Sequence, residues 1–119
     1  MINVSKSAET LQDGIANMMA GAKDDYKQNS LMGKSELSSY CKEKLENFES
    51  QTTVREGKKY IKVIYDRSVF AFIVKEDFKH FKKGDVLKPA SWAAPTLNQP
   101  RGNVLKGNYP IQWTGPLYL

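Results

Sequence analysis

The apolar residues of the first half of the chain recur at steps of three and four positions. The series is Val4, Ala8, Leu11, Ile15, Met18, Ala22 and Tyr26. This spacing places the residues on one face of an α-helix and predicts a helix from about residue 5 to about residue 28. Ser5 or Ser7 would cap its start, because a serine hydroxyl accepts a hydrogen bond from an unpaired amide of the first turn.

A second apolar series follows a polar break at residues 28–33. A helix capped by Ser35 would carry on one face Leu37, Tyr40, Cys41, Leu45 and Phe48. Two amphipathic helices joined by a short loop predict a helical hairpin over residues 5–50. Gly14 and Gly21 border the first apolar stripe, and each costs a helix about 1 kcal/mol relative to alanine. Either another backbone packs closely there, or the two glycines have no structural role.

The second half of the chain has the composition of β-strands. Residues 59–65 and 68–74 are rich in β-branched and aromatic side chains and predict an antiparallel hairpin with a tight connection at residues 66–68. Because the second strand is apolar on both faces, we expect it to be central and covered on both sides. Residues 52–54 predict an edge strand, and residues 86–87 predict a short strand that Pro89 ends.

The remaining segments are divided by turn residues. Residues 76–81 predict one helical turn before the bend at residues 82–85. Prolines, glycines and asparagines fragment the chain from residue 89 onward, where we expect short strands at 103–105 and 111–113. The aromatic side chains of Trp92, Tyr109, Trp113 and Tyr118 indicate that this tail is folded.

The order of the elements predicts the fold class. Helices come first and strands second, without the alternation that a doubly wound parallel sheet requires. We therefore expect an α+β fold of one domain over residues 1–119. A helical hairpin over residues 5–50 is followed over residues 52–116 by a small antiparallel sheet or a partly open Src-homology-3-like barrel.

Composition narrows the functional classes. Cys41 is the only cysteine and His80 the only histidine, which excludes an internal disulfide and a metal cluster built from several of these residues. No apolar run approaches the roughly 18 to 20 residues that cross a bilayer. The first residues lack the features of a signal peptide, so we expect a cytoplasmic protein, in a host cell if a phage encodes it.

No catalytic constellation stands out. Gly33-Lys34-Ser35 imitates the end of a phosphate-binding loop, but that motif needs a glycine where this chain has Gln28. The serines lie outside any G-x-S-x-G elbow. The carboxylates of residues 76, 77 and 85 lie among lysines, as on a solvated face. We therefore expect no enzyme, no cofactor and no bound metal.

Charge divides unevenly along the chain. Residues 1–50 hold six basic and eight acidic side chains, a net charge of −2, whereas residues 51–119 hold twelve and five, a net charge of +7. A basic half raises the expectation of contact with nucleic acid or an acidic partner. The alternative is that these lysines keep a β-rich half soluble and protect its strand edges. The excess is concentrated in Arg55, Lys58, Lys59, Lys62, Lys75, Lys79, Lys82 and Lys83.

The most distinctive sequence lies in the tail. It comprises Phe81-Lys82-Lys83-Gly84-Asp85-Val86-Leu87-Lys88-Pro89-Ala90-Ser91-Trp92, Ala94-Pro95, Arg101-Gly102-Asn103-Val104 and Trp113-Thr114-Gly115-Pro116. Over residues 58–119 the chain resembles small uncharacterised proteins of tailed marine bacteriophages, the cyanophage myoviruses. That family has no assigned activity to transfer. The resemblance directs attention to Trp92, Arg101, Asn103 and Trp113, which would form a stacking and ion-pairing pocket unless the tryptophans fill a small core.

Two functional hypotheses follow. The first is a non-catalytic phage-type accessory domain that acts by protein–protein association. Its self-association face, as a homodimer or toward a protein partner, would be Leu11, Gly14, Met18 and Gly21. The second is weak, sequence-independent nucleic-acid binding by the basic half. Its candidate contacts, which would equally serve a protein partner, are Lys79, Lys82, Lys83, Trp92, Arg101, Asn103 and Trp113.

Overall fold

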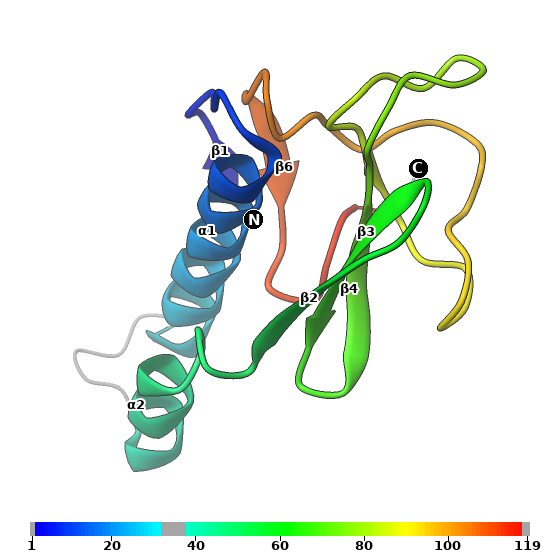
Figure 1. Cartoon of the computed structure of the whole chain (residues 1–119). Helices are drawn as coiled ribbons and strands as arrows, with labels where there is room; N and C mark the ends of the chain where they lie inside the picture. The colour runs from blue at the N-terminus through cyan, green and yellow to red at the C-terminus, as the bar shows by residue number, and fades with distance from the viewer. Residues whose placement is uncertain (1, 32–37, 118–119) are drawn as a thin grey trace.

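The computed structural model describes residues 2–31 and 38–117 and has two helices and two antiparallel sheets (Figure 1). The helices are α1 (Leu11–Leu31) and α2 (Ser39–Glu46). The strands are β1 (Ile2–Val4), β2 (Thr52–Glu56), β3 (Tyr60–Tyr65), β4 (Ser68–Val74), β5 (Val86–Leu87) and β6 (Tyr109–Ile111). One sheet has the order β1-β6 and the other β2-β3-β4-β5. The predicted α+β class with a small antiparallel sheet is confirmed, and the two separate sheets do not close into a barrel.

Helix α1 begins later than the apolar spacing predicted. Thr10 precedes it, and the Thr10 hydroxyl accepts a hydrogen bond from the Asp13 N–H at 3.1 Å, so Ser5 and Ser7 are not its cap. Val4 belongs instead to strand β1, where it lies opposite Tyr109 of β6. The prediction of helix at residues 5–10 was wrong because Val4 and Ala8 share the helical spacing by chance, while Val4 is buried by pairing with β6.

Helix α2 is present and shorter than predicted. The Ser38 hydroxyl caps it by accepting a hydrogen bond from the Cys41 N–H at 3.2 Å. The predicted cap, Ser35, lies outside the described residues. Phe48 follows the helix and is only 1% exposed, so the apolar end of the second stripe is in the core as predicted.

The predicted hairpin and both of its neighbouring strands are confirmed. Strands β3 and β4 pair with Ile61 opposite Ile73, and Asp66 and Arg67 make the turn with φ values of 46° and 71°. Strand β2 pairs with β3 and forms one edge of the sheet, and β5 pairs with β4 at the other end. Val63, Ala71 and Ile73 are fully buried in these central strands.

The sheet has two different faces. Its inner face packs with α1, α2, β1 and β6 in the main core, through Ile61, Val63 and Ile73 among others. Its outer face carries a smaller core of Phe72, Val74, Phe81 and Leu87, bordered by Tyr60, Val69 and Phe78. Residues of β4 belong to both cores, so this strand is covered on both sides as its composition predicted. In Figure 1 the yellow segment after β5 lies across the sheet from α1.

Three local predictions were wrong. Residues 76–81 form no helical turn, because Phe78 and Phe81 exchange backbone hydrogen bonds of 3.1 and 2.8 Å as a tight bridge. Residues 103–105 form no strand; Asn103 makes an isolated bridge to Asp85. The last strand covers residues 109–111 rather than 111–113, because its partner β1 lies opposite those residues.

No helix within residues 2–31 and 38–117 is long and apolar enough to cross a membrane.

Candidate nucleic-acid interface

Two cations and a tryptophan meet on the outer face of the sheet. Arg55 of β2 lies directly opposite Lys62 of β3. The Lys62 Nζ lies 4.5 Å from the centre of the Trp92 ring, and the Arg55 guanidinium carbon lies 6.0 Å from it. The Trp92 side chain is 49% exposed. An accessible aromatic surface is therefore flanked by two positive charges.

A closed loop holds Trp92 in this position. Its base is the bridge between Pro89 and Pro95. Next to the tryptophan, the N–H groups of Ala90 and Ser91 both donate to the Ala94 carbonyl, at 3.0 and 3.1 Å. The local sequence thus forms a small hairpin that presents the indole to the sheet.

A shallow groove continues from this loop. It encloses about 250 Å³ and runs past Ala93 to the turn between β2 and β3. Two more exposed lysines, Lys58 and Lys59, line it together with Tyr60. Burial raises the pKa of the Tyr60 phenol, which therefore stays neutral. We refer to this surface as the basic–aromatic face: Arg55, Lys58, Lys59, Tyr60, Lys62 and Trp92.

Among the described residues, no cation of this face forms an ion pair, although the carboxylate of Glu56 lines the same groove. The ion pairs among those residues are Lys23–Glu49, Lys75–Glu56 and Lys82–Asp77, and none includes a cation of the basic–aromatic face. Like charges opposite each other on neighbouring strands repel. An anion would relieve that repulsion.

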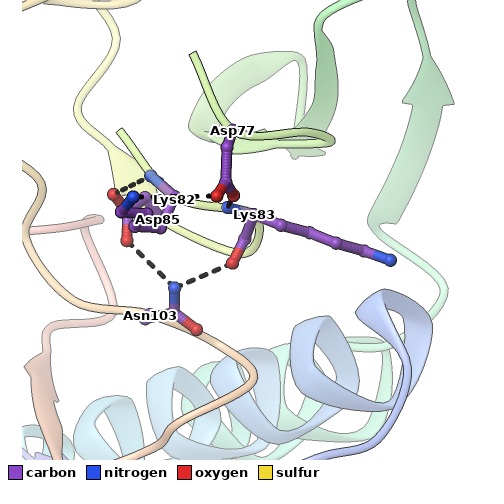
Figure 2. A network of polar contacts seen from close by, with 5 residues as sticks. All are labelled: Asp77, Lys82, Lys83, Asp85 and Asn103. Atoms are coloured by element: carbon purple, nitrogen blue, oxygen red, sulfur yellow. Dashed lines mark hydrogen bonds and ion pairs between the residues drawn. The ribbon is translucent and has the colours of Figure 1, made fainter. Parts of the chain in front are cut away.

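Lys82 and Lys83, predicted as binding residues, lie in a different place (Figure 2). Their backbone N–H groups donate to Asp85 at 2.8 Å and to Asp77 at 2.7 Å. The Asn103 side-chain amide donates to the Lys83 carbonyl and to Asp85, both at 2.9 Å, and so links the two ends of this turn. This turn is therefore a folded polar cluster whose carboxylates reduce its net charge. Lys79, in the preceding turn, is exposed at a φ of 52°.

The predicted pocket of Trp92, Arg101 and Trp113 is not formed. The Trp113 ring packs edge-on against Tyr26 of α1 at 5.1 Å, and the Trp113 backbone N–H donates to the Asp25 carboxylate at 2.9 Å. The Arg101 guanidinium donates to the Leu117 carbonyl at 3.0 Å and to Asn98 and Gln99. These side chains hold the proline-rich tail to the rest of the chain, which was the alternative left open for Trp113.

The predicted self-association face is occupied by the chain itself. Gly14 packs on Val104, whose carbonyl oxygen would lie 2.6 Å from an added Cβ, and Gly21 packs on Val4 and Ile111. Met18, between them, is fully buried. The glycines do allow another backbone to come close, as expected, but this backbone belongs to the same chain. Only Leu11 is partly exposed, at the start of α1.

Leu11 lines a larger apolar cleft on the inner side of the sheet. The cleft encloses about 820 Å³ between the first half of α1 and strand β2. Ile15 and Met19 form its helical wall, and Val54 and Ile61 form its sheet wall. Sequence reasoning missed this cleft, because the distance between a helix and an edge strand depends on tertiary packing.

The remaining candidates for other chemistry are metal ligands, His80 and Cys41. Within the described ranges, no three acidic, histidine or cysteine residues are grouped as metal ligands. His80 Nε2 lies 2.6 Å from the Asn98 carbonyl oxygen, and its ring lies on Phe81. Cys41 is half-buried beside the Tyr26 hydroxyl. The expectation that the protein is not an enzyme stays a prediction.

One protein family has a model that matches residues 1–119; its description is family of unknown function (DUF7717). No curated protein and no solved structure matches the chain.

Proposed function

Since the chain belongs to this family of unknown function, we propose from its own surface that it binds single-stranded nucleic acid on the basic–aromatic face, without catalysis. One observation carries the proposal: Arg55 and Lys62 lie opposite each other over the half-exposed ring of Trp92. A base can stack on an exposed indole while neighbouring cations hold the phosphates, which is how sequence-independent single-strand binders work.

The structure favours a single strand over a duplex. The groove beside Trp92 is shallow and ends at the lysine-rich turn between β2 and β3. Arg55 offers a planar fork of donors for one phosphate. Lys58, Lys59 and Lys62 add point charges along the same groove. The protein-association hypothesis no longer has its helical face, because the chain itself covers Gly14, Met18 and Gly21.

The test is fluorescence anisotropy with labelled single-stranded oligonucleotides of mixed sequence over a salt series. Four phosphate contacts would give a slope of log affinity against log salt near −3, at about −0.7 per contact. Trp92→Ala should weaken binding by about 1–3 kcal/mol, because it removes the stacking surface, and Trp92→Phe should keep most of it.

Two charge-reversal pairs provide the matched control. Arg55→Glu with Lys62→Glu changes the net charge by the same amount as Lys82→Glu with Lys83→Glu. The first pair should abolish binding and the second should leave most of it, because only the first acts at Trp92. Equal losses of affinity in the two variants would show that binding depends on overall charge and would refute a defined site. No binding by the wild-type chain at low ionic strength would refute the proposal as a whole.

A further inference from the structure

The groove beside Trp92 contains one acidic side chain. All residues that line the groove belong to the described part of the chain, and Glu56 is the only carboxylate among them. Glu56 is the last residue of β2 and follows Arg55 directly, and its side chain is 67% exposed. A free carboxylate at this position would repel the phosphates that Arg55 and the neighbouring lysines attract. The proposed site therefore works best when the charge of Glu56 is neutralised.

Lys75 neutralises this carboxylate from the end of strand β4. The Lys75 Nζ lies 2.7 Å from Oε1 of Glu56. The Lys75 side chain is only 25% exposed, so water and salt screen this pair less than they screen a fully exposed one. Lys75 itself does not line the groove. It therefore acts on the groove through Glu56.

The same lysine holds the turn between β2 and β3. Its ammonium group donates to the Gly57 carbonyl at 3.0 Å, and its backbone N–H donates to the Lys59 carbonyl, also at 3.0 Å. Within the turn, the Gly57 N–H donates to the Tyr60 carbonyl at 2.8 Å. Lys75 thus contacts both ends of the turn that carries Lys58 and Lys59.

The position of this turn decides where Lys59 points. The Lys59 Nζ lies 5.7 Å from the centre of the Phe78 ring, which borders the smaller core on the outer face of the sheet. The Lys62 Nζ lies 5.8 Å from the Phe72 ring of the same core. Both ammonium groups therefore lie on the outer face, where Trp92 is. A shift of the turn would move Lys59 away from this line of cations.

We propose that Lys75 is a positioning residue of the nucleic-acid site, an inference that rests on the proposed function. Lys75 contacts no nucleotide. It keeps the Glu56 carboxylate paired, so the groove presents positive charge to the phosphates. It also fixes the turn, so that Lys58 and Lys59 continue the line of cations that begins at Arg55.

The test compares Lys75→Met with Lys23→Met in the anisotropy assay with single-stranded oligonucleotides. Both variants lose one positive charge and leave a glutamate unpaired, because the Lys23 Nζ lies 2.8 Å from Glu49. Only Lys75→Met frees a carboxylate in the groove. It should weaken binding about three- to tenfold at low salt, whereas Lys23→Met should weaken it less than about twofold.

Rescue separates repulsion by Glu56 from a merely structural role of the ion pair. Adding Glu56→Gln to Lys75→Met should recover most of the lost affinity, because the amide carries no charge. A merely structural role predicts no recovery, since the double variant still lacks the pair. Lys75→Arg should bind like the wild-type chain, because a guanidinium group keeps both the charge and the donors.

Hydrogen exchange of the free protein tests the turn without nucleic acid. The Gly57 amide should exchange faster in Lys75→Met than in the wild-type chain, because one of the contacts that hold the turn is lost. Lys23→Met should leave this exchange rate unchanged. An unchanged rate in Lys75→Met would show that Lys75 does not fix the turn.

The outcomes distinguish this role from the proposed function. Wild-type binding that depends on Trp92, together with equal affinities of Lys75→Met and Lys23→Met, would refute the role of Lys75 and leave the proposed function intact. A loss in Lys75→Met that Glu56→Gln does not restore would refute the repulsion by Glu56. No binding by the wild-type chain would refute the proposed function and this role together.

Discussion

Arg55 and Lys62 lie directly opposite each other on neighbouring strands, so their like charges repel. A like-charged pair directly across two strands costs roughly 0.2–1 kcal/mol. The Trp92 ring offsets part of this, since a cation near an exposed aromatic face gains about 0.5–1 kcal/mol. The two charges therefore change the free energy of folding little and are not a source of stability. An anion bound between them, as proposed above, would remove the remaining repulsion.

The buried phenol of Tyr109 should contribute to the loss of stability at alkaline pH. Tyr109 is 2% exposed, its hydroxyl has no hydrogen-bond partner among the described residues, and burial raises its pKa. The unfolded chain loses this proton near pH 10. The folded state binds it more tightly, so its contribution to stability is complete below about pH 10 and is lost as the pH rises further.

Urea unfolding from neutral to alkaline pH should therefore show the free energy of unfolding falling above about pH 10. Tyr109→Phe should reduce that fall without abolishing it, because burial also raises the pKa of Tyr26 and Tyr65. Tyr40→Phe is the control, since its side chain is 70% exposed. An unchanged pH dependence in Tyr109→Phe would contradict the assignment.

At the scale of elements, helix α1 is positioned by contacts that only small residues permit. Gly14 touches Val104, and Gly21 touches β1 and β6. Gly14 lets the loop that contains Val104 approach the helix backbone, and Gly21 does the same for the β1–β6 strand pair. The exposed start of α1 forms one wall of the cleft beside β2.

Gly14→Ala should destabilise the protein although alanine favours helix. The new Cβ would lie 2.6 Å from the Val104 carbonyl oxygen and 2.7 Å from its Cβ. Overpacking of this kind costs about 1–3 kcal/mol, against a gain in helix propensity of about 1 kcal/mol. Ala20→Gly, on an exposed position of the same helix, should cost about 1 kcal/mol through propensity alone. Thermal melts of both variants are compared with that of the wild-type chain. A Tm of Gly14→Ala above the wild-type value would contradict this packing.

Sequence patterns predicted the elements whose signal is local. The hairpin of β3 and β4, the edge strand β2 and the short strand β5 follow from β-branched runs and turn residues. Strand β1 was missed because three residues that pair with a strand about 105 positions away leave no local pattern. The grouping of Arg55 and Lys62 with Trp92 depends on the register of β2 with β3 and on a loop that crosses the outer face. Composition therefore showed only an excess of positive charge in residues 51–119. A correct alignment of β2 with β3 would by itself have placed Arg55 opposite Lys62.

At the scale of the whole molecule, the first and the last strand pair with each other and contribute to one core. Strand β1 pairs with β6, and the main core includes Val4, Met18, Ile73 and Ile111. Trp113 is tied to α1 through Asp25, with a hydrogen bond of 2.9 Å. The helical and sheet portions, which the sequence separates at about residue 51, therefore share their buried surface.

The chain should consequently unfold as one unit, and its basic half should not fold alone. A fragment of residues 52–119 lacks α1 and β1, and so exposes Ile73 and Ile111, which are fully buried in the intact chain. Exposing each such side chain costs about 1.5–3 kcal/mol, and several of them together exceed the stability typical of a small domain. Circular dichroism of α1 and the fluorescence of Trp113, measured in the Trp92→Phe variant of the full chain, should give coincident melting curves. Separate transitions, or a fragment 52–119 that melts cooperatively, would show that the sheet is independent of the helices. Nucleic-acid binding by such a fragment would then have to be measured on its own.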